Sequence, residues 1–478
     1  MIRTKIIATV GPASESPERI GELIDAGVDV FRLNFSHGTL DWHGRTLEHI
    51  RRVSVERGAT TAVMADLCGP KIRVDPVGGG SIEIAPGDEI DLVSGHVEGN
   101  AHRISTNRPE LAREVGVGER VLIDDGSVRL RVREALPDRL RLVCEVGGSI
   151  GTRKGVNLPD STLQMPALTE KDRRDLAWAL DRGMEYVALS FVRSATDLMT
   201  LRSLLPLSED TCEVVAKIET PQAVADLDAI IEATDVVLVA RGDLGVEMEL
   251  AEVPLVQKEI TRKCQQTGKP VIVATQMLQS MVDRPTATRA EVSDVANAIL
   301  DSADCVMLSA ETSVGAYPVQ SVKMMNRIAE RTEAYLDASG IAPRMDASLT
   351  IRRVTTAVAH GASLLARELD AKLVAVWTGT GKTTRLLSKC RLDRPVIGLS
   401  PDGRVCRRMA LYYGVVPVHL THTDEVQAML GEVDRMLLDQ QLAAEGDRVV
   451  VVAGTRLEKP GATNSLLIHL VKGRSDPL

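Results

Sequence analysis

Residues 213–221 combine the pattern of a buried strand with two groups that can do chemistry. Valine and isoleucine favour a strand here, and a proline ends it. Lys217 and Glu219 lie two residues apart, so on a strand both side chains point to the same face. A cation and a carboxylate at the end of an apolar strand are costly to bury unless they are paired or coordinated. Taken alone, this stretch favours a structural ion pair at a strand end.

Most of the other strands predicted from the sequence also end in polar residues. The polar residues at the strand ends are Arg32, Asn34 and Ser36; Asp66; Lys217 and Glu219; Arg241, Gly242 and Asp243; Thr275; and Ser309 and Glu311. In a parallel barrel the carboxyl ends of the strands meet on one face, and the active sites of barrel enzymes lie there. We therefore expect these side chains to surround one site.

Glu219 and Asp243 are carboxylates that we expect on adjacent strands. Two carboxylates with open coordination positions suit Mg²⁺, which prefers oxygen ligands and leaves room for substrate oxygens. Alternatively, one of the carboxylates pairs with Lys217 or Arg241. Gly242 precedes a predicted short helix, where backbone N–H groups can approach an anion closely.

Arg32 could hold a phosphoryl group through two hydrogen bonds. The alternative for Arg32 is a salt bridge with Asp66 or Glu311 at the mouth of the barrel. Together, a lysine, an arginine, a metal ion and a helix N-terminus would form a site for a dianionic substrate that develops further charge.

The order of predicted elements favours a barrel. Strands alternate with helices before and after a long insertion, and the predicted strands are 5–10, 29–35, 61–67, 186–192, 213–219, 235–242, 271–277 and 305–311. This alternation predicts a parallel sheet with crossover helices, and eight such units favour a TIM barrel. An open doubly wound sheet is the alternative, but the first strand lacks a glycine-rich dinucleotide turn.

Two other regions depart from the barrel pattern. Residues from about 69 to 166 are rich in glycine and short alternating strands, including a hairpin at 121–130, which predicts a small inserted all-β domain. From about residue 346 the α/β pattern resumes, which predicts a separate open-sheet domain.

Composition excludes several classes of protein. The net charge of −9 argues against general binding to nucleic acid or to a membrane surface, and no apolar run reaches transmembrane length. The seven cysteines show no C-x-x-C spacing and no metal-ligand pattern. Reduced thiols fit a cytoplasmic protein best, and the first residues lack the pattern of a signal peptide.

Eight stretches, in order, resemble the pyruvate kinase family. They are residues 9–12, 32–38, 69–73, 154–159, 217–219, 240–245, 274–278 and 307–312. The resemblance implies α/β architecture with a TIM (β/α)₈ barrel catalytic domain (1–69 and 168–345), an inserted small β-barrel lid domain (70–167) and a C-terminal open-sheet α/β regulatory domain (346–478). It also implies transfer of a phosphoryl group from phosphoenolpyruvate to ADP, and the family expectation is a homotetramer.

The resemblance also assigns roles to matching residues. Glu219 and Asp243 are expected to hold Mg²⁺ or Mn²⁺, and Lys217 to stabilise the phosphoryl group and the enolate oxygen. Backbone groups of Gly242 and Asp243, with Thr275, are expected to bind the substrate carboxylate, and Thr275 to act in enolate protonation through a water chain. The residues expected at phosphoryl and nucleotide phosphate oxygens are Arg32, Arg73, Asn34, Ser36, Asp66 and Lys154.

Lys71 distinguishes this chain from many relatives. Many pyruvate kinases require K⁺ and carry Glu in the motif Gly-Pro-Glu-Ile-Arg, whereas this chain has Lys71 at that position, which is similar to the potassium-independent branch. A tethered ammonium can supply the charge that K⁺ otherwise brings. We expect that K⁺ is not required. The alternative is that Lys71 points to solvent at the base of the lid.

The loop 378–384 aligns with the effector phosphate loop of the family. Thr378, Thr380, Lys382 and Thr383, with the backbone amides, suit a phosphate at the start of a helix. We expect activation by a phosphorylated sugar or a nucleotide monophosphate, with Arg456 and Lys459 as further candidate contacts. The alternative is an inert turn between a strand and a helix.

Two other functions remain as alternatives. A metal-dependent barrel aldolase that acts on pyruvate or phosphoenolpyruvate would share the carboxylate pair and an arginine. It would not need Lys154 on an inserted lid, or Lys217 beside the metal. A non-catalytic sugar-phosphate sensor on the same fold is the second alternative, and the intact set of site residues argues against it.

Overall fold

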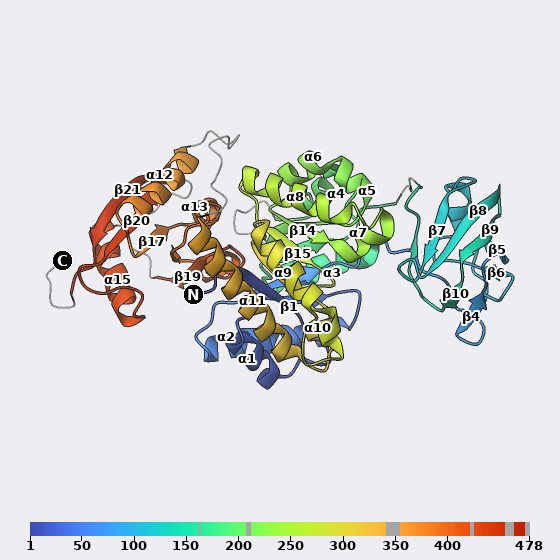
Figure 1. Ribbon diagram of the computed structural model, residues 1–478, viewed down its shortest axis with the longest axis horizontal. Coiled ribbons are helices and arrows are strands. Elements are labelled where there is room, and N and C mark those ends of the chain that lie inside the picture. Colours follow the sequence, from blue (N-terminus) through green and yellow to red (C-terminus); the bar gives the residue numbers. More distant parts are fainter. Residues whose placement is uncertain are drawn as a thin grey trace.

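The computed structural model describes residues 1–161, 163, 165–206, 212–340, 354–420, 425–454 and 463–473. The chain forms three parts in a row, with the barrel in the middle, the inserted β domain at one end and the C-terminal domain at the other (Figure 1). The family-based expectation of these three parts is therefore confirmed. The residue boundaries between them stay a prediction, and the boundary at 345/346 lies outside the described residues.

The central domain is a closed parallel barrel with the strand order β1-β16-β15-β14-β13-β12-β3-β2. This confirms the predicted TIM barrel over the open sheet. The strands are β1 (Lys5–Thr9), β2 (Val30–Asn34), β3 (Ala62–Asp66), β12 (Tyr186–Leu189), β13 (Glu213–Ile218), β14 (Val236–Ala240), β15 (Val271–Ala274) and β16 (Cys305–Leu308). Each is one to three residues shorter than predicted, largely because residues at the carboxyl ends lie in turns or short helices rather than in the ladder.

Helices surround the barrel, and local capping signals fix where several of them begin. The Ser16 side chain accepts a hydrogen bond from Arg19 N, and Pro17 opens α1. Thr169 and Asp172 form a capping box at the start of α3. The barrel helices are α1 (Pro17–Asp25), α2 (Leu40–Glu56), α3 (Glu170–Asp181), α4 (Ala195–Arg202), α5 (Pro221–Ala225), α6 (Leu227–Ala233), α7 (Arg241–Glu247), α8 (Val253–Thr267), α9 (Arg289–Leu300), α10 (Ala310–Ser313) and α11 (Pro318–Ser339), with a 3₁₀ turn at Gln279–Val282.

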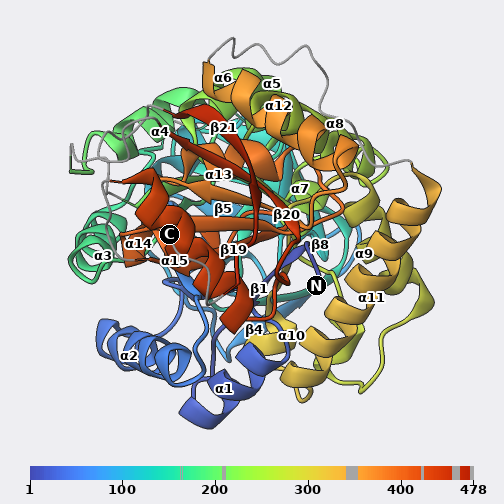
Figure 2. The same cartoon turned by 90° about the vertical axis from the view of Figure 1, so that its left-hand side faces the viewer.

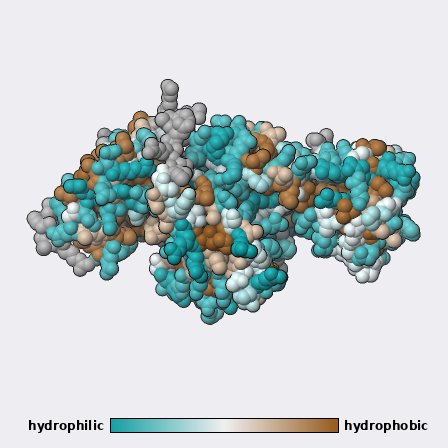
Figure 3. All heavy atoms as spheres, in the orientation of Figure 1, coloured by the Kyte–Doolittle hydropathy of each residue, from teal (hydrophilic) through white to brown (hydrophobic). Residues whose placement is uncertain are grey.

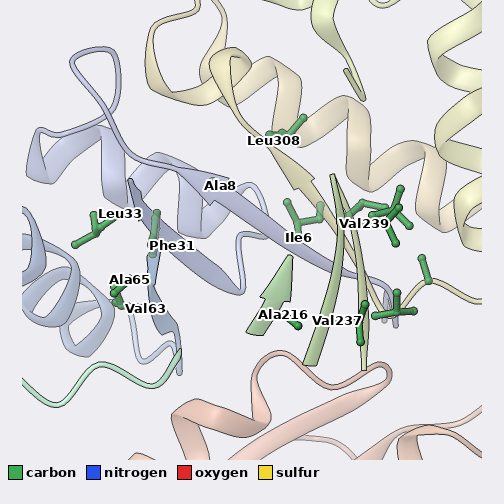
Figure 4. Close-up of a cluster of buried hydrophobic side chains, with 14 of the residues drawn as sticks. Ile6, Ala8, Phe31, Leu33, Val63, Ala65, Ala216, Val237, Val239 and Leu308 are labelled. Atoms are coloured by element: carbon green, nitrogen blue, oxygen red, sulfur yellow. The ribbon is translucent and has the colours of Figure 1, made fainter. Parts of the chain in front are cut away.

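Alternation along each strand divides the barrel core into two layers. On β1, Ile6 and Ala8 belong to the cluster between strands and helices, and Ile7 belongs to the cluster that fills the barrel interior. Figure 4 shows part of the outer cluster, where side chains from β1, β2, β3 and β14 project from the strands. The inner cluster continues into the C-terminal domain through residues such as Leu411 and Tyr412. The bottom of the barrel is therefore sealed by the C-terminal domain.

The inserted domain is built on antiparallel strands, as predicted, with one parallel pair. Its six-stranded sheet has the order β11-β7-β8-β9-β5-β6, and β10 pairs with β4 in a second sheet. The predicted hairpin is formed by β7 and β8, and its turn places Asp124, Asp125 and Gly126 at positive φ. The strands are β4 (Ser81–Ile84), β5 (Glu89–Val93), β6 (Arg103–Ile104), β7 (Arg120–Ile123), β8 (Val128–Leu136), β9 (Arg139–Val146), β10 (Gly148–Gly151) and β11 (Val156–Asn157), with a 3₁₀ turn at Pro109–Arg113.

The C-terminal domain is a five-stranded sheet with the order β19-β18-β17-β20-β21, in which β21 runs antiparallel to its neighbour. The predicted open-sheet domain is confirmed, and Figure 2 shows it in front of the ring of barrel helices. The elements are α12 (Val354–Glu368), β17 (Leu373–Trp377), α13 (Lys382–Ser388), β18 (Val396–Ser400), α14 (Gly403–Met409), β19 (Val415–His419), α15 (Val426–Asp439), β20 (Arg448–Gly454) and β21 (Thr463–Leu470).

The face of the molecule in Figure 3 is largely hydrophilic, with hydrophobic residues in small scattered groups. Within the described parts of the chain, no helix combines the length and apolar character needed to cross a membrane.

Candidate active site

Four predicted site residues meet at the carboxyl ends of β2, β3 and β13. Lys217 Nζ lies 2.9 Å from Glu219 Oε1 and 3.4 Å from Asp66 Oδ1. Arg32 Nε donates to Asp66 Oδ2 at 2.7 Å. The side chains of Lys217 and Arg32 are 11% exposed and those of the two acids 2%, so two cations and two anions share a nearly dry site that still reaches solvent.

The electrostatic balance keeps Lys217 charged. Burial alone would lower the pKa of the lysine, but Asp66 and Glu219 outweigh it and raise that pKa above its ordinary value. Burial likewise opposes ionisation of Asp66, yet Lys217 and Arg32 bring its pKa below the usual range. Burial raises the pKa of Glu219 to about 6, against the attraction of Lys217. Lys217 is therefore a fixed positive charge aimed at this face of the barrel.

The alternative geometry considered for Arg32 is present. Besides the ion pair with Asp66, Arg32 Nη1 donates to Thr9 Oγ1 at 3.0 Å. Glu311, the other partner considered, instead accepts backbone hydrogen bonds from Leu278 and Ser309. A carboxylate that holds the guanidinium in one orientation also preorganises it, so the pairing is compatible with a contact to a phosphoryl oxygen.

Glu219 and Asp243 come from neighbouring βα connections, but Asp243 lies in the first turn of α7 rather than on a strand. This corrects the prediction that both carboxylates stand on strands; the backbone turns into the helix immediately after Ala240. Glu219 Oε2 also accepts from Phe191 N at 2.7 Å. Asp243 is close enough to contribute to the pKa values of both Lys217 and Glu219.

The donor set fits a hard divalent cation completed by its substrate. Among the described residues no group of three or more His, Cys, Asp or Glu side chains forms a metal cage. Glu219 and Asp243 supply two carboxylates, and Mg²⁺ is typically bound by one or two carboxylates together with water and substrate oxygens. The residues present therefore fit Mg²⁺ better than a metal that needs a full set of protein ligands.

Thr275 and Gly242 lie together beside this group. Gly242 N donates to Thr275 Oγ1 at 2.7 Å, and a Cβ on Gly242 would stand only 3.3 Å from that oxygen. Thr275 and Gln276 both have positive φ, at 65° and 53°. Such strained residues persist only where the surroundings hold them, and they cluster at functional sites. The backbone N–H of Gly242, which we predict to bind the substrate carboxylate, is occupied by the Thr275 hydroxyl in this structure. A ligand would have to displace that hydroxyl.

The residues expected at the nucleotide phosphates are divided between two domains. Asn34 and Ser36 form a turn at the end of β2, in which Ser36 N donates to Asn34 Oδ1 at 3.1 Å. In the lid, Arg73 Nη1 donates to Arg153 O at 3.0 Å and Lys154 pairs with Asp124 at 3.0 Å. The structure thus leaves both lid residues engaged within the lid rather than with the barrel residues.

Lys71 lies where the chain passes from barrel to lid. It is half-buried, and its Cε lies 3.0 Å from the position of a Cβ on Gly155. It also lines a cavity of about 320 Å³ at this junction. The alternative of a lysine that points to solvent and the role of Lys71 in place of K⁺ both stay predictions.

The effector loop is compact in this structure. Thr378 Oγ1 accepts from Gly381 N at 2.9 Å, Gly381 has φ 79°, and Thr383 and Thr463 share a hydroxyl hydrogen bond of 2.7 Å. Thr380 is half-buried and Lys382 exposed. The further candidates Arg456 and Lys459 lie outside the described residues.

Sequence reasoning missed two partners of the site. Ser190, which follows β12, accepts a hydrogen bond from Lys217 Nζ at 2.7 Å, and Thr9 at the end of β1 contacts Arg32. Both are polar residues at strand ends, so the same rule that selected the other site residues would have found them.

The fold and this site define a class: a TIM-barrel enzyme with an inserted lid and a charged, metal-compatible site at the strand ends. Comparison with known proteins is specific. The family model described as pyruvate kinase, barrel domain matches residues 1–322, and the model described as pyruvate kinase, alpha/beta domain matches residues 356–469.

Individual relatives agree over nearly the whole length. A pyruvate kinase from Agrobacterium vitis is 43% identical, over 98% of this chain and 96% of its own. One from Geobacillus stearothermophilus is 40% identical, over 98% of this chain and 80% of its own. A crystal structure of a pyruvate kinase from Cryptosporidium parvum superposes with a TM-score of 0.90 at 33% identity, covering 98% of this chain and 96% of that one.

The chain therefore belongs to the pyruvate kinase family, a family of phosphotransferases. Because the matches include the lid and the C-terminal domain, neither the aldolase nor the sensor is favoured.

Proposed function

We propose that this protein transfers the phosphoryl group of phosphoenolpyruvate to ADP, giving pyruvate and ATP. The observation that carries the proposal is the placement of Lys217, a buried and charged lysine, 2.9 Å from the carboxylate of Glu219. A fixed cation beside a candidate metal ligand suits a reaction in which negative charge moves between phosphoryl and enolate oxygens.

Each residue has a role that follows from its contacts. Lys217 stabilises the phosphoryl group in transit and the enolate oxygen that remains. Arg32, oriented by Asp66, binds phosphoryl oxygens. Thr275 and the backbone at Gly242 and Asp243 hold the substrate carboxylate once it displaces the hydrogen bond between them. Protonation of the enolate proceeds through water ordered by the Thr275 hydroxyl.

Glu219 and Asp243 would hold Mg²⁺ or Mn²⁺. The ion, when bound, supplies charge neutralisation to the phosphoryl and enolate oxygens. Asn34, Ser36 and Asp66 on the barrel, with Arg73 and Lys154 on the lid, would contact the nucleotide phosphates after the lid moves. Lys71 would supply the charge that makes K⁺ unnecessary.

The C-terminal domain is proposed to carry the regulatory site. Loop 378–384 would take the phosphate of a sugar phosphate or a nucleotide monophosphate, with Thr378, Thr380, Lys382 and Thr383 as contacts. The family expectation of a homotetramer, together with the reduced thiols expected from the cysteine spacing, completes the proposal of a cytoplasmic allosteric enzyme.

A coupled assay with phosphoenolpyruvate, ADP and Mg²⁺ tests the proposal directly. Glu219→Gln and Asp243→Asn each remove a charged ligand, so turnover should be lost and Mn²⁺ affinity should fall by about tenfold or more. Glu252→Gln, which changes an exposed carboxylate after α7, is the matched control and should behave as wild type. Wild-type Mn²⁺ affinity in both site variants would count against the metal assignment.

A further inference from the structure

A hydrogen bond connects the lid directly to the barrel beside the site. Asn157 ends β11, whose register pairs it with Leu122 of β7 inside the lid sheet. Its Nδ2 donates to Glu247 Oε1 at 2.6 Å, and Glu247 is the last residue of α7 in the barrel. Helix α7 lies on the side of the barrel that faces the lid (Figure 1). The two partners thus belong to different domains but form one contact.

The surroundings make this contact matter energetically. Burial raises the pKa of Glu247, and the hydrogen bond from Asn157 opposes that rise. A carboxylate in such a setting loses hydration, and leaving it without its donor costs more than the loss of an exposed hydrogen bond. Separating Asn157 from Glu247 is therefore unfavourable unless another donor takes its place.

Next to this pair lies the cavity of about 320 Å³ at the base of the lid. Both chain segments that join lid and barrel line it, through Pro70 and Ile72 on one side and Leu158 and Met165 on the other. Close-packed interiors resist rearrangement, whereas an unfilled space at a hinge allows the connecting segments to shift. Two polar contacts join lid and barrel around this cavity: Asn157 donates to Glu247, and Arg193 donates to the carbonyl oxygens of Leu163 and Met165, at 3.2 and 2.6 Å.

The hydrogen bond between Asn157 and Glu247 connects the lid half and the barrel half of the proposed site. Asp243, a candidate metal ligand, lies four residues before Glu247 on α7, which is about one helical turn. Lys154, a candidate nucleotide contact, lies three residues before Asn157 and now pairs with Asp124 inside the lid. The angle of the lid at Asn157 therefore sets where Lys154 lies relative to Asp243.

We propose that Glu247 is a positioning residue for the nucleotide: its hydrogen bond to Asn157 fixes the pivot about which the lid closes and brings Lys154 to the phosphates of ADP. This inference rests on the proposed role of Lys154. Glu247 lies four residues after Asp243 on α7 and is not one of the proposed metal ligands, so its loss should act on ADP binding more than on the metal.

The kinetics of four variants, with a fifth as the control, test the role of this hydrogen bond. Glu247→Ala and Asn157→Ala should each raise the KM for ADP by about tenfold or more, with Mn²⁺ affinity unchanged. Glu247→Gln keeps an acceptor oxygen and should stay within about threefold of wild type. The double variant Asn157→Ala/Glu247→Ala should be no worse than either single variant, because both remove the same contact. Glu249→Gln, an exposed carboxylate two residues away, is the control.

Hydrogen exchange in the substrate-free enzyme distinguishes the effect of the contact between Asn157 and Glu247 from the effect of Lys154. Glu247→Ala and Asn157→Ala should speed amide exchange in β11 and β7, whereas Lys154→Ala should raise the KM for ADP without changing exchange. If Lys154→Ala leaves the KM unchanged while Glu247→Ala loosens β11, the nucleotide role of Lys154 fails and the pivot stands. Wild-type exchange and KM in Glu247→Ala, or equal loss of Mn²⁺ affinity in Glu247→Ala and Glu247→Gln, would overturn the proposal.

Discussion

Replacing Asp304 with asparagine should weaken the contact between the barrel and the C-terminal domain. Asp304 immediately precedes β16, and its side chain is completely buried. Its carboxylate pairs with Lys389 and with Arg391, at 3.1 Å for the latter, and accepts from Val271 N at 2.7 Å. Lys389 and Arg391 belong to the C-terminal domain and are 0% and 5% exposed. The substitution leaves two buried cations facing a neutral amide.

The loss in the free energy of unfolding comes from the charges rather than from the hydrogen bonds. The asparagine oxygen can still accept from Val271 N, so the backbone contact survives. Removing one partner of a buried ion pair costs about 3–5 kcal/mol, because the remaining charge stays desolvated. This is a large share of a domain stability that is typically about 5–15 kcal/mol.

The pH dependence gives an independent check. Burial lowers the pKa of Lys389 in the folded protein, and the attraction of Asp304 opposes this. Without Asp304 that pKa should fall further. Between the folded pKa and the ordinary lysine value near 10.4, the unfolded chain binds more protons, so stability rises with pH in that window. The window is wider in Asp304→Asn, and the variant should regain part of its loss as the pH is raised from 7 to 9.5.

Urea unfolding followed by circular dichroism, at both pH values, measures the difference. Asp228→Asn is the control: Asp228 is 82% exposed and pairs with Lys263, so its loss should cost no more than about 1 kcal/mol. If Asp304→Asn matches this control at pH 7, or if its deficit does not shrink at high pH, the buried charges are not what holds this interface.

Three further predictions concern activity. Lys217→Met should reduce ATP formation by about a thousandfold while sparing Mn²⁺ binding; retained ATP formation would exclude the lysine from the mechanism. The wild type should be near maximally active without K⁺ or NH₄⁺, and Lys71→Glu should create a K⁺ requirement; strong stimulation of the wild type by KCl, beyond an equal concentration of a tetramethylammonium salt, would contradict this. Lys382→Ala should lose activation by phosphorylated effectors in a kinetic screen, and an effector-blind wild type would refute the regulatory site.

The barrel and most of its site could be predicted because the signals are local. β-branched runs interrupted by a polar residue at the carboxyl end identify strands that deliver Arg32, Asp66 and Lys217 to one face. The capping box at Thr169 and the proline at Pro17 likewise act on the backbone beside them. Such features require no knowledge of distant partners.

The pairing of particular side chains could not be predicted, because it depends on the tertiary structure. Arg32 had two acidic candidates, and only the folded structure shows that its partner is Asp66. The left-handed backbone at Thr275 has no sequence signal, since threonine does not favour positive φ. The pair between Lys389 and Asp304 joins residues 85 positions apart in different domains.

The strand end at which a charged residue lies distinguishes the charges that stabilise the fold from those that take part in the chemistry. Acidic residues also precede or begin several strands, at the opposite face of the barrel, and basic residues pair with them there. These pairs are Asp29 with Lys5, Glu185 with Arg51 and Arg407, Glu213 with Arg385, Asp235 with Arg202, and Asp304 with Lys389 and Arg391. Conserved chemistry in barrels lies at the carboxyl ends, and the amino ends serve stability. A buried charge in this sequence therefore indicates chemistry only when it follows a strand, as Glu219 follows β13, whereas Glu213 at the start of the same strand contacts Tyr412 of the C-terminal domain.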